Sequence, residues 1–147
     1  MEPFVRHFIR SSLSWLGVGV LLGLWMALDA RAVIYRPAHM HANLLGFVSM
    51  MIFGVAYHVL PRFSGAALRS RRTASVHVWV ANVGLALMVG GWMTRATLPG
   101  LSRAALVGGG VLSAAGAFLF IGNIWLTLDD AGRRPSLMAA PARAVRP

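Results

Sequence analysis

Residues 36–62 have the sequence RPAHMHANLLGFVSMMIFGVAYHVLPR, in which the stretch 41–60 is uncharged and almost wholly apolar. A membrane-spanning helix needs about 17–25 such residues, so this stretch predicts one. Pro37 suits the start of a helix, and Pro61 predicts its end. Three more uncharged stretches of similar length flank it, at residues 11–28, 73–94 and 104–128. The chain is therefore predicted to be an all-α, integral membrane four-helix bundle.

The composition leaves no room for a separate soluble domain. The chain has 147 residues, of which 57% are hydrophobic and only 12% are charged. We expect one transmembrane domain over residues 1–128, because the four apolar stretches and their short connections occupy all of it. Residues 129–147 are rich in proline, alanine and arginine, which is typical of a disordered tail.

The charges are arranged as a topology signal. All fourteen basic residues are arginines outside the apolar stretches, and the net charge is +10. Ten lie on the side of the two termini, namely Arg6, Arg10, Arg62, Arg69, Arg71, Arg72, Arg133, Arg134, Arg143 and Arg146. Four lie on the other side, namely Arg31, Arg36, Arg95 and Arg103. The positive-inside rule then predicts that both termini and the second connection lie in the cytoplasm. We expect a multi-pass protein of the bacterial inner membrane. Contacts with anionic lipids in the bilayer, and no nucleic-acid partner, are expected.

The available side chains exclude several kinds of chemistry. There is no cysteine, which excludes disulfides, thiolate metal sites and covalent haem attachment. The four acidic residues lie at the chain ends or in connections, so proton pumping or a carboxylate metal site is not expected. Histidine, methionine and aromatic residues remain, and this set suits haem.

His39 and His41 stand at the mouth of the second apolar stretch. Residues at i and i+2 of a helix point about 200° apart, so the two histidines cannot hold one metal together. Each can instead reach a different site. On spacing alone, the alternative to a ligand role is that His39 and His41 cap the helix or are solvated at the outer boundary of the membrane. Met26 and Met93 lie at a similar predicted depth and are potential partners, although methionine in an apolar helix is usually packing.

Two further pairs of features leave alternatives open. His58 and His77 flank the inner connection and are predicted to be neighbours, either as a second metal site or as residues bonded to water or a free carbonyl. Small residues recur four positions apart, at Gly19 and Gly23, and again at Gly109 and Ser113. This spacing lets helices approach closely, within one chain or between copies.

Two segments resemble helix II of haem–copper oxidase subunit I, in its cbb3-type oxidase and nitric oxide reductase branch. They are residues 36–47 (RPAHMHANLLGF) and 53–62 (FGVAYHVLPR). Residues 5–15 resemble the first helix of that branch, and residues 109–127 resemble its last helix. The chain is thus similar to a short, four-helix version of that subunit. Helices that match the binuclear centre are absent from this sequence, so reduction of oxygen or nitric oxide by this chain alone is not expected.

The resemblance implies a cofactor and a set of residues for it. His41 matches the ligand of the low-spin haem in the family, near the outer surface. Haem b is therefore the expected cofactor, with Arg36 and either Arg95 or Arg103 beside its propionates. Electron transfer is the expected role, with a respiratory donor or acceptor as partner. A cofactor-free accessory subunit and a haem-based gas sensor or small reductase are the alternatives.

The family architecture also suggests an assembly. Its helices form three pseudo-symmetric arcs, and a low-spin haem lies between arcs. By analogy we expect a homo-oligomer, most simply a trimer, in which His41 of one subunit and His39 of the next are the axial ligands. A two-fold dimer with His41 on both sides of one haem is the main rival. His41 with Met93 of the same subunit is the third arrangement.

Overall fold

The computed structural model describes residues 1–132 and is helical almost throughout this part of the chain. Four helical stretches are long and apolar enough to cross a membrane: Pro3–Leu28, Ala30–Phe63, Arg71–Thr94 and Pro99–Gly132. The described part contains no strand. The predicted all-α, four-helix membrane architecture is thereby confirmed.

The first helix begins earlier than its apolar stretch suggests. Helix α1 runs over Pro3–Leu28 rather than 11–28. Its first turns carry Arg6 and His7, so hydropathy alone misses them, but Phe4, Val5 and Phe8 are buried. An apolar stripe at helical spacing therefore packs these turns against the rest of the molecule.

The last helix also exceeds its predicted bounds. Helix α5 spans Pro99–Gly132, so the prediction of a disordered tail from residue 129 is wrong for residues 129–132. Asp130 forms an ion pair with Arg69 at 3.2 Å, and Thr127 accepts a hydrogen bond from the Arg69 backbone N–H at 3.0 Å. These contacts attach the end of α5 to the connection before α4, Arg71–Thr94. The remainder of the predicted tail, from residue 133 onward, lies outside the described residues.

The second span changes its helical geometry along its length. It starts as a 3₁₀ helix, η1 (Ala30–Tyr35), and continues as a short α-helix, α2 (Arg36–His41). A π-helical segment follows, η2 (Ala42–Ser49), and then α3 (Met50–Phe63) completes the span. Each of these segments adjoins the next without an intervening loop. His41 is therefore the last residue before the helix widens, and π-helical turns are frequent at functional sites.

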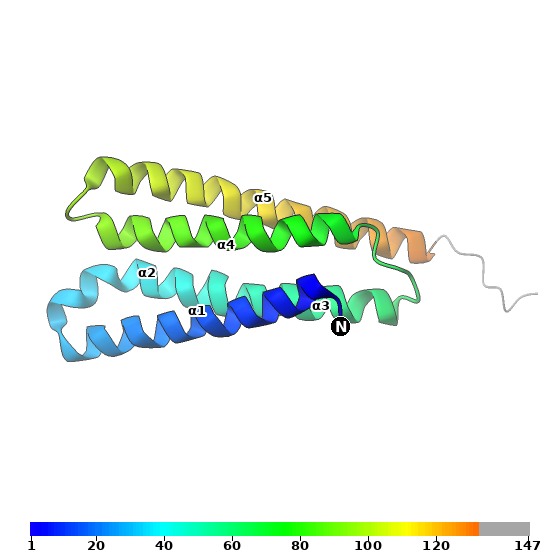
Figure 1. Cartoon of the computed structure of the whole chain (residues 1–147), viewed down its shortest axis with the longest axis horizontal. Helices are drawn as coiled ribbons and strands as arrows, with labels where there is room; N and C mark the ends of the chain where they lie inside the picture. Colours follow the sequence, from blue (N-terminus) through cyan, green and yellow to red (C-terminus); the bar gives the residue numbers. More distant parts are fainter. Residues whose placement is uncertain (133–147) are drawn as a thin grey trace, which may run out of the picture.

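The four spans are arranged as two packed pairs (Figure 1). Helix α4 packs closely against α5 and also contacts α2, η2 and α1, while α1 packs along the α2–α3 span. Among the described residues, α1 and α5 make no extensive contact. The α4–α5 pair is the most closely packed, because glycines face each other: a Cβ on Gly109 would lie 2.6 Å from the Gly84 carbonyl oxygen. The small-residue spacing at Gly109 and Ser113 thus serves packing within the chain.

Candidate functional site

His41 ends helix α2 with one ring nitrogen fixed and the other without a partner. Its Nδ1 lies 2.7 Å from the carbonyl oxygen of Pro37, one turn earlier. A carbonyl only accepts hydrogen bonds, so Nδ1 carries a proton, and in the neutral imidazole the lone pair is then on Nε2. Within the described part of the chain, no residue hydrogen-bonds this Nε2. His41 is half-buried, and its Nε2 is in the form that binds a metal.

Trp92 and Arg95, at the end of α4, lie beside His41 and form a row of three side chains with it. The ring of His41 lies 6.4 Å from the Trp92 ring, centroid to centroid, and the Arg95 guanidinium stacks on Trp92 at 5.1 Å. The Trp92 indole Nε1 is buried and has no hydrogen-bond partner among the described residues. A buried donor without an acceptor is costly, so an acceptor brought by a ligand would stabilise it.

His41 lines a groove over α2 and the start of η2. It is lined by Pro37, Met40, His41, Leu44 and Leu45, and its volume is about 260 Å³. Sites that enclose a drug-sized ligand usually have about 300–1,000 Å³. The groove is therefore an apolar, open surface that would cover one face of a flat ligand.

His39 points to a different neighbour, as the i, i+2 spacing predicts. Its Nδ1 lies 2.8 Å from the Gly19 carbonyl oxygen in α1, so this nitrogen also donates. The side-chain amide of Asn43 lies 3.5 Å from His39 Nε2. A Cβ on Gly23 would lie 3.0 Å from the His39 ring, and one on Gly19 would clash with the Asn43 side chain. The Gly19 and Gly23 pair thus receives His39 and Asn43 within the same chain.

The other residues proposed for the haem lie at the same end of the molecule. Met93 is half-buried and packs against the hydrophobic core. Arg36, at the start of α2, and Arg103, in α5, are both exposed. Arg95 is the arginine placed next to His41, through its stack on Trp92. The described residues contain no group of three or more histidine, cysteine or acidic side chains that would hold a metal ion by themselves.

His58 and His77 have separate partners at the opposite end. His58 Nδ1 is 3.0 Å from an Arg62 guanidinium nitrogen on the next turn. His77 is fully buried, and its Nδ1 lies 3.2 Å from the Tyr57 hydroxyl. Nothing in their positions points to a shared metal. No pattern in the sequence indicates the Tyr57–His77 pair or the place of Trp92, because both depend on which helix faces which.

Comparison with known proteins identifies the family. Residues 31–119, which include the second span from Arg31 onward and all of α4, match the model of the cytochrome c and quinol oxidase polypeptide I family. The chain belongs to this family. The resemblance seen in residues 36–62 is thereby confirmed.

Two curated members of the family are similar to the chain at low identity. The cbb3-type cytochrome c oxidase subunit CcoN1 of Stutzerimonas stutzeri is 27% identical over 118 residues, covering 76% of this chain and 25% of that protein. Cytochrome c oxidase subunit 1 of Rhodobacter capsulatus is 24% identical over an alignment of 172 residues, covering 96% of this chain and 32% of that protein. The chain therefore spans about a quarter to a third of the length of these relatives. No solved structure matches it.

Family membership and the four spans together describe a multi-pass membrane protein related to the bacterial respiratory oxidases. His41, His39, Trp92 and Arg95 all lie inside the matched range of residues.

Proposed function

We propose that this protein is a membrane cytochrome that holds haem b through His41 and transfers electrons. The observation that carries the proposal is the hydrogen bond from His41 Nδ1 to the Pro37 carbonyl. Histidines that bind metals usually donate the other ring N–H to a carbonyl or carboxylate, which fixes the tautomer and the direction of the ring. His41 has this arrangement through the Pro37 carbonyl.

The surroundings of His41 also fit a haem. The groove is apolar, as a porphyrin face requires, and a haem needs only axial ligands from the protein. Arg95 is held beside His41 on Trp92, where its guanidinium would pair with a propionate. The unpartnered Trp92 indole N–H is a second donor in the same row. Arg36 begins the helix that His41 ends and is a further candidate for a propionate.

The groove at His41 is open, which favours a site completed by a second copy of the chain. Since α2 covers only one face of the ligand, we propose that another subunit supplies the other face and the second axial ligand. In the trimer this ligand is His39 of the next subunit, and in the dimer it is His41 of the partner. Met93 of the same subunit is half-buried and packs against the core, so as a ligand it would have to give up part of that contact.

The contacts of His39 and His41 bear on this choice. His39 donates its Nδ1 proton to the Gly19 carbonyl, as a ligand would. The Asn43 amide nitrogen donates to the His39 carbonyl oxygen at 2.9 Å and lies 3.3 Å and 3.5 Å from the two ring nitrogens. Ligation by His39 would therefore bring the ligand close to the Asn43 amide, whereas His41 Nε2 has no such neighbour bonded to it among the described residues.

Two axial histidines favour electron transfer over gas binding. A haem iron with both axial positions filled cycles between the ferrous and ferric states and leaves no site open for a small molecule. The partners would then be a respiratory electron donor and acceptor on the side of the membrane where His41 lies. A haem with one histidine would instead bind carbon monoxide, which would indicate the gas sensor or small reductase.

The test is haem content and ligation in the purified protein. We expect a Soret band and a bis-histidine spectrum for the wild type, both lost in His41→Ala. His58→Ala is the matched control, because it removes a half-buried histidine from the opposite end and should keep both. His39→Ala and Met93→Leu then identify the second ligand: spectral loss in His39→Ala supports the trimer, and its retention supports the dimer.

The haem-to-chain ratio provides an independent reading. A ratio near one agrees with the trimer, and a ratio near one half agrees with the dimer. A protein expressed with ample haem that shows no Soret band dependent on His41 would refute haem binding and leave the cofactor-free accessory subunit as the function.

A further inference from the structure

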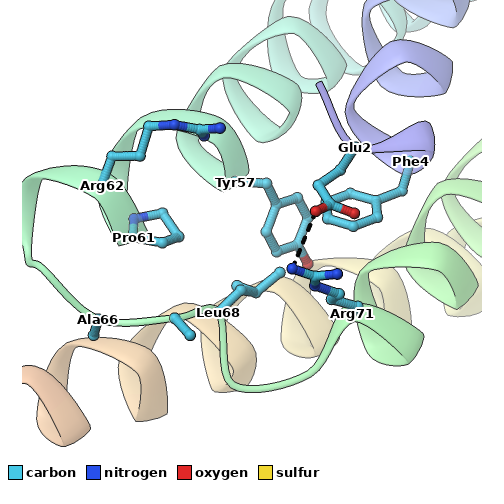
Figure 2. Close-up of a pocket in the computed structure, with 9 residues that line it drawn as sticks. Glu2, Phe4, Tyr57, Pro61, Arg62, Ala66, Leu68 and Arg71 are labelled. Carbon is cyan, nitrogen blue, oxygen red and sulfur yellow. Dashed lines mark ion pairs between the residues drawn. The ribbon is translucent and has the colours of Figure 1, made fainter.

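A second pocket lies at the opposite end of the molecule from His41, where α1, α3 and the start of α4 meet (Figure 2). It has a volume of about 230 Å³, and its lining includes Glu2, Phe4, Tyr57, Arg62, Leu68 and Arg71. The arginine distribution predicts that this end faces the cytoplasm. Both apolar and basic side chains therefore meet here at the predicted level of the lipid headgroups.

The two arginines of the pocket are held in place by different partners. Arg71 forms an ion pair with Glu2 at 3.2 Å, drawn as the dashed line in Figure 2. Arg62 donates to Nδ1 of His58 at 3.0 Å and also to the His58 carbonyl, both one turn earlier in α3. Both guanidinium groups keep further N–H donors, since each carries five. The lining of the pocket thus includes two exposed cations and one carboxylate.

An apolar groove lies on α3, one of the helices that line the pocket. It is lined by Met51, Ile52, Val55, Ala56, Val59 and Leu60, and its volume is about 340 Å³. Val55, Val59 and Arg62 follow one another at helical spacings of four and three residues, so they share one face of α3. The groove and the pocket have no lining residue in common, but Arg62, which lines the pocket, lies next along the face of α3 that the groove occupies.

We propose that this pocket and groove bind one anionic phospholipid. The phosphate lies between Arg62 and Arg71, and an acyl chain follows the groove of α3 toward the middle of the bilayer. Basic pockets at the cytoplasmic ends of membrane helices bind the phosphates of anionic lipids. A free phosphate has the same headgroup chemistry but would make no use of the apolar groove, so the lipid is the occupant that fits both features.

Glu2 has the role of a competitor in this proposal. Its carboxylate pairs with Arg71 while the phosphate is absent, and both side chains are partly exposed, at 36% and 73%. Exposed ion pairs are weak, so a phosphate can replace the carboxylate on Arg71. Removing the charge of Glu2 should therefore strengthen lipid binding rather than weaken it.

The experiment measures lipid binding to the full-length protein in a neutral detergent. Phosphatidylglycerol and phosphatidylcholine with identical acyl chains are titrated, and bound lipid is counted by native mass spectrometry. We expect a preference for phosphatidylglycerol, reduced about fivefold by Arg71→Gln or by Arg62→Gln, which corresponds to about 1 kcal/mol per arginine at a membrane surface. Arg72→Gln is the matched control, because it removes the same charge at the next position, outside the pocket. It should change the preference less than twofold.

Further arms of the experiment distinguish a bound lipid from a free phosphate and from a purely structural ion pair. Equal losses in all three arginine variants, or no preference for phosphatidylglycerol in the wild type, would overturn the proposal. Inorganic phosphate that displaces the lipid at equal concentration would indicate a free phosphate site and would also overturn it. Glu2→Gln should raise lipid binding, a gain that misfolding does not produce. A loss in Glu2→Gln comparable to that in Arg71→Gln would show that the ion pair is only structural, which contradicts the proposal.

Discussion

His77 is a buried polar residue in an aromatic surrounding. Its ring lies 4.8 Å from the rings of both Phe8 and Phe53, and 6.0 Å from that of Phe120. The Tyr57 hydroxyl bonds its Nδ1, while its Nε2 has no partner among the described residues. This one hydrogen bond therefore provides all the polar compensation that the structure gives to a fully buried imidazole.

A double-mutant cycle on this pair tests its contribution to stability. Tyr57→Phe leaves His77 Nδ1 without a partner and should destabilise the fold by about 1 kcal/mol. The cycle with His77→Phe should give a coupling energy of about 0.6 kcal/mol, the average for hydrogen bonds between membrane helices. Reversible unfolding in detergent by denaturant provides the measurement. Strictly additive effects of the two substitutions would show that the hydrogen bond contributes nothing.

The histidines also show what a sequence predicts about single residues. The i, i+2 spacing correctly separates His39 from His41, because the spacing fixes the angle between them. It does not predict that His39 faces Gly19 in α1 and His41 faces Trp92 in α4, since these partners are far away in the sequence. The spacing does not predict the tautomer of His41 either, although the Pro37 carbonyl that fixes it is local. The haem role of both residues stays a prediction.

At the scale of the helices, an apolar stretch predicts that a helix exists better than it predicts where the helix begins and ends. They predict all four spans, but α1 and α5 extend beyond their apolar stretches. Their extra turns are amphipathic or polar and are held by packing at Phe4 and Phe8 and by contacts of Thr127 and Asp130. α3 also continues past Pro61 to Phe63, because a proline near the end of a helix removes only one of its hydrogen bonds.

The α4–α5 contact provides a prediction at this scale. In Gly109→Ala the added Cβ would lie 2.6 Å from the Gly84 carbonyl and 2.7 Å from Met88, so the helices must separate. We expect a loss of about 1–3 kcal/mol, the usual cost of overpacking. Gly108→Ala is the control on the neighbouring position, where a Cβ meets nothing within 4 Å. Thermal unfolding in detergent should rank the two variants clearly, and equal melting temperatures would contradict the close contact.

At the scale of the whole molecule, the order of the spans follows from the sequence, but the open faces do not. Short connections predict antiparallel neighbours, and Figure 1 shows α1 beside the α2–α3 span and α4 beside α5. The faces through which these two helix pairs pack on each other, and the grooves that remain open, depend on the shapes of the side chains. The pocket at Arg62 and Arg71 and the groove at His41 are therefore surfaces that hydropathy and spacing do not predict.

The predicted orientation can be tested cleanly because the chain contains no cysteine. Single cysteines are introduced at Thr97, in the exposed turn between α4 and α5, and at Ala67, in the exposed connection between α3 and α4. The positive-inside rule predicts that Thr97→Cys reacts with a membrane-impermeant thiol reagent in spheroplasts. Ala67→Cys should react only after the membrane is permeabilised. The reverse pattern would place the termini outside.

The π-helical segment separates the two ends of the second span in rotation. A π-helical hydrogen bond spans one residue more than an α-helical one, so each turn of η2 contains more residues than a turn of α-helix. If the same residues 42–49 formed regular α-helix, each would add about 100° of rotation, more than a residue of a π turn adds, and α2 would be turned against α3. His41 and Tyr57 would then no longer face α4 and His77 at the same time. The π-helical geometry of this segment thus sets the angle between the two ends of the second span.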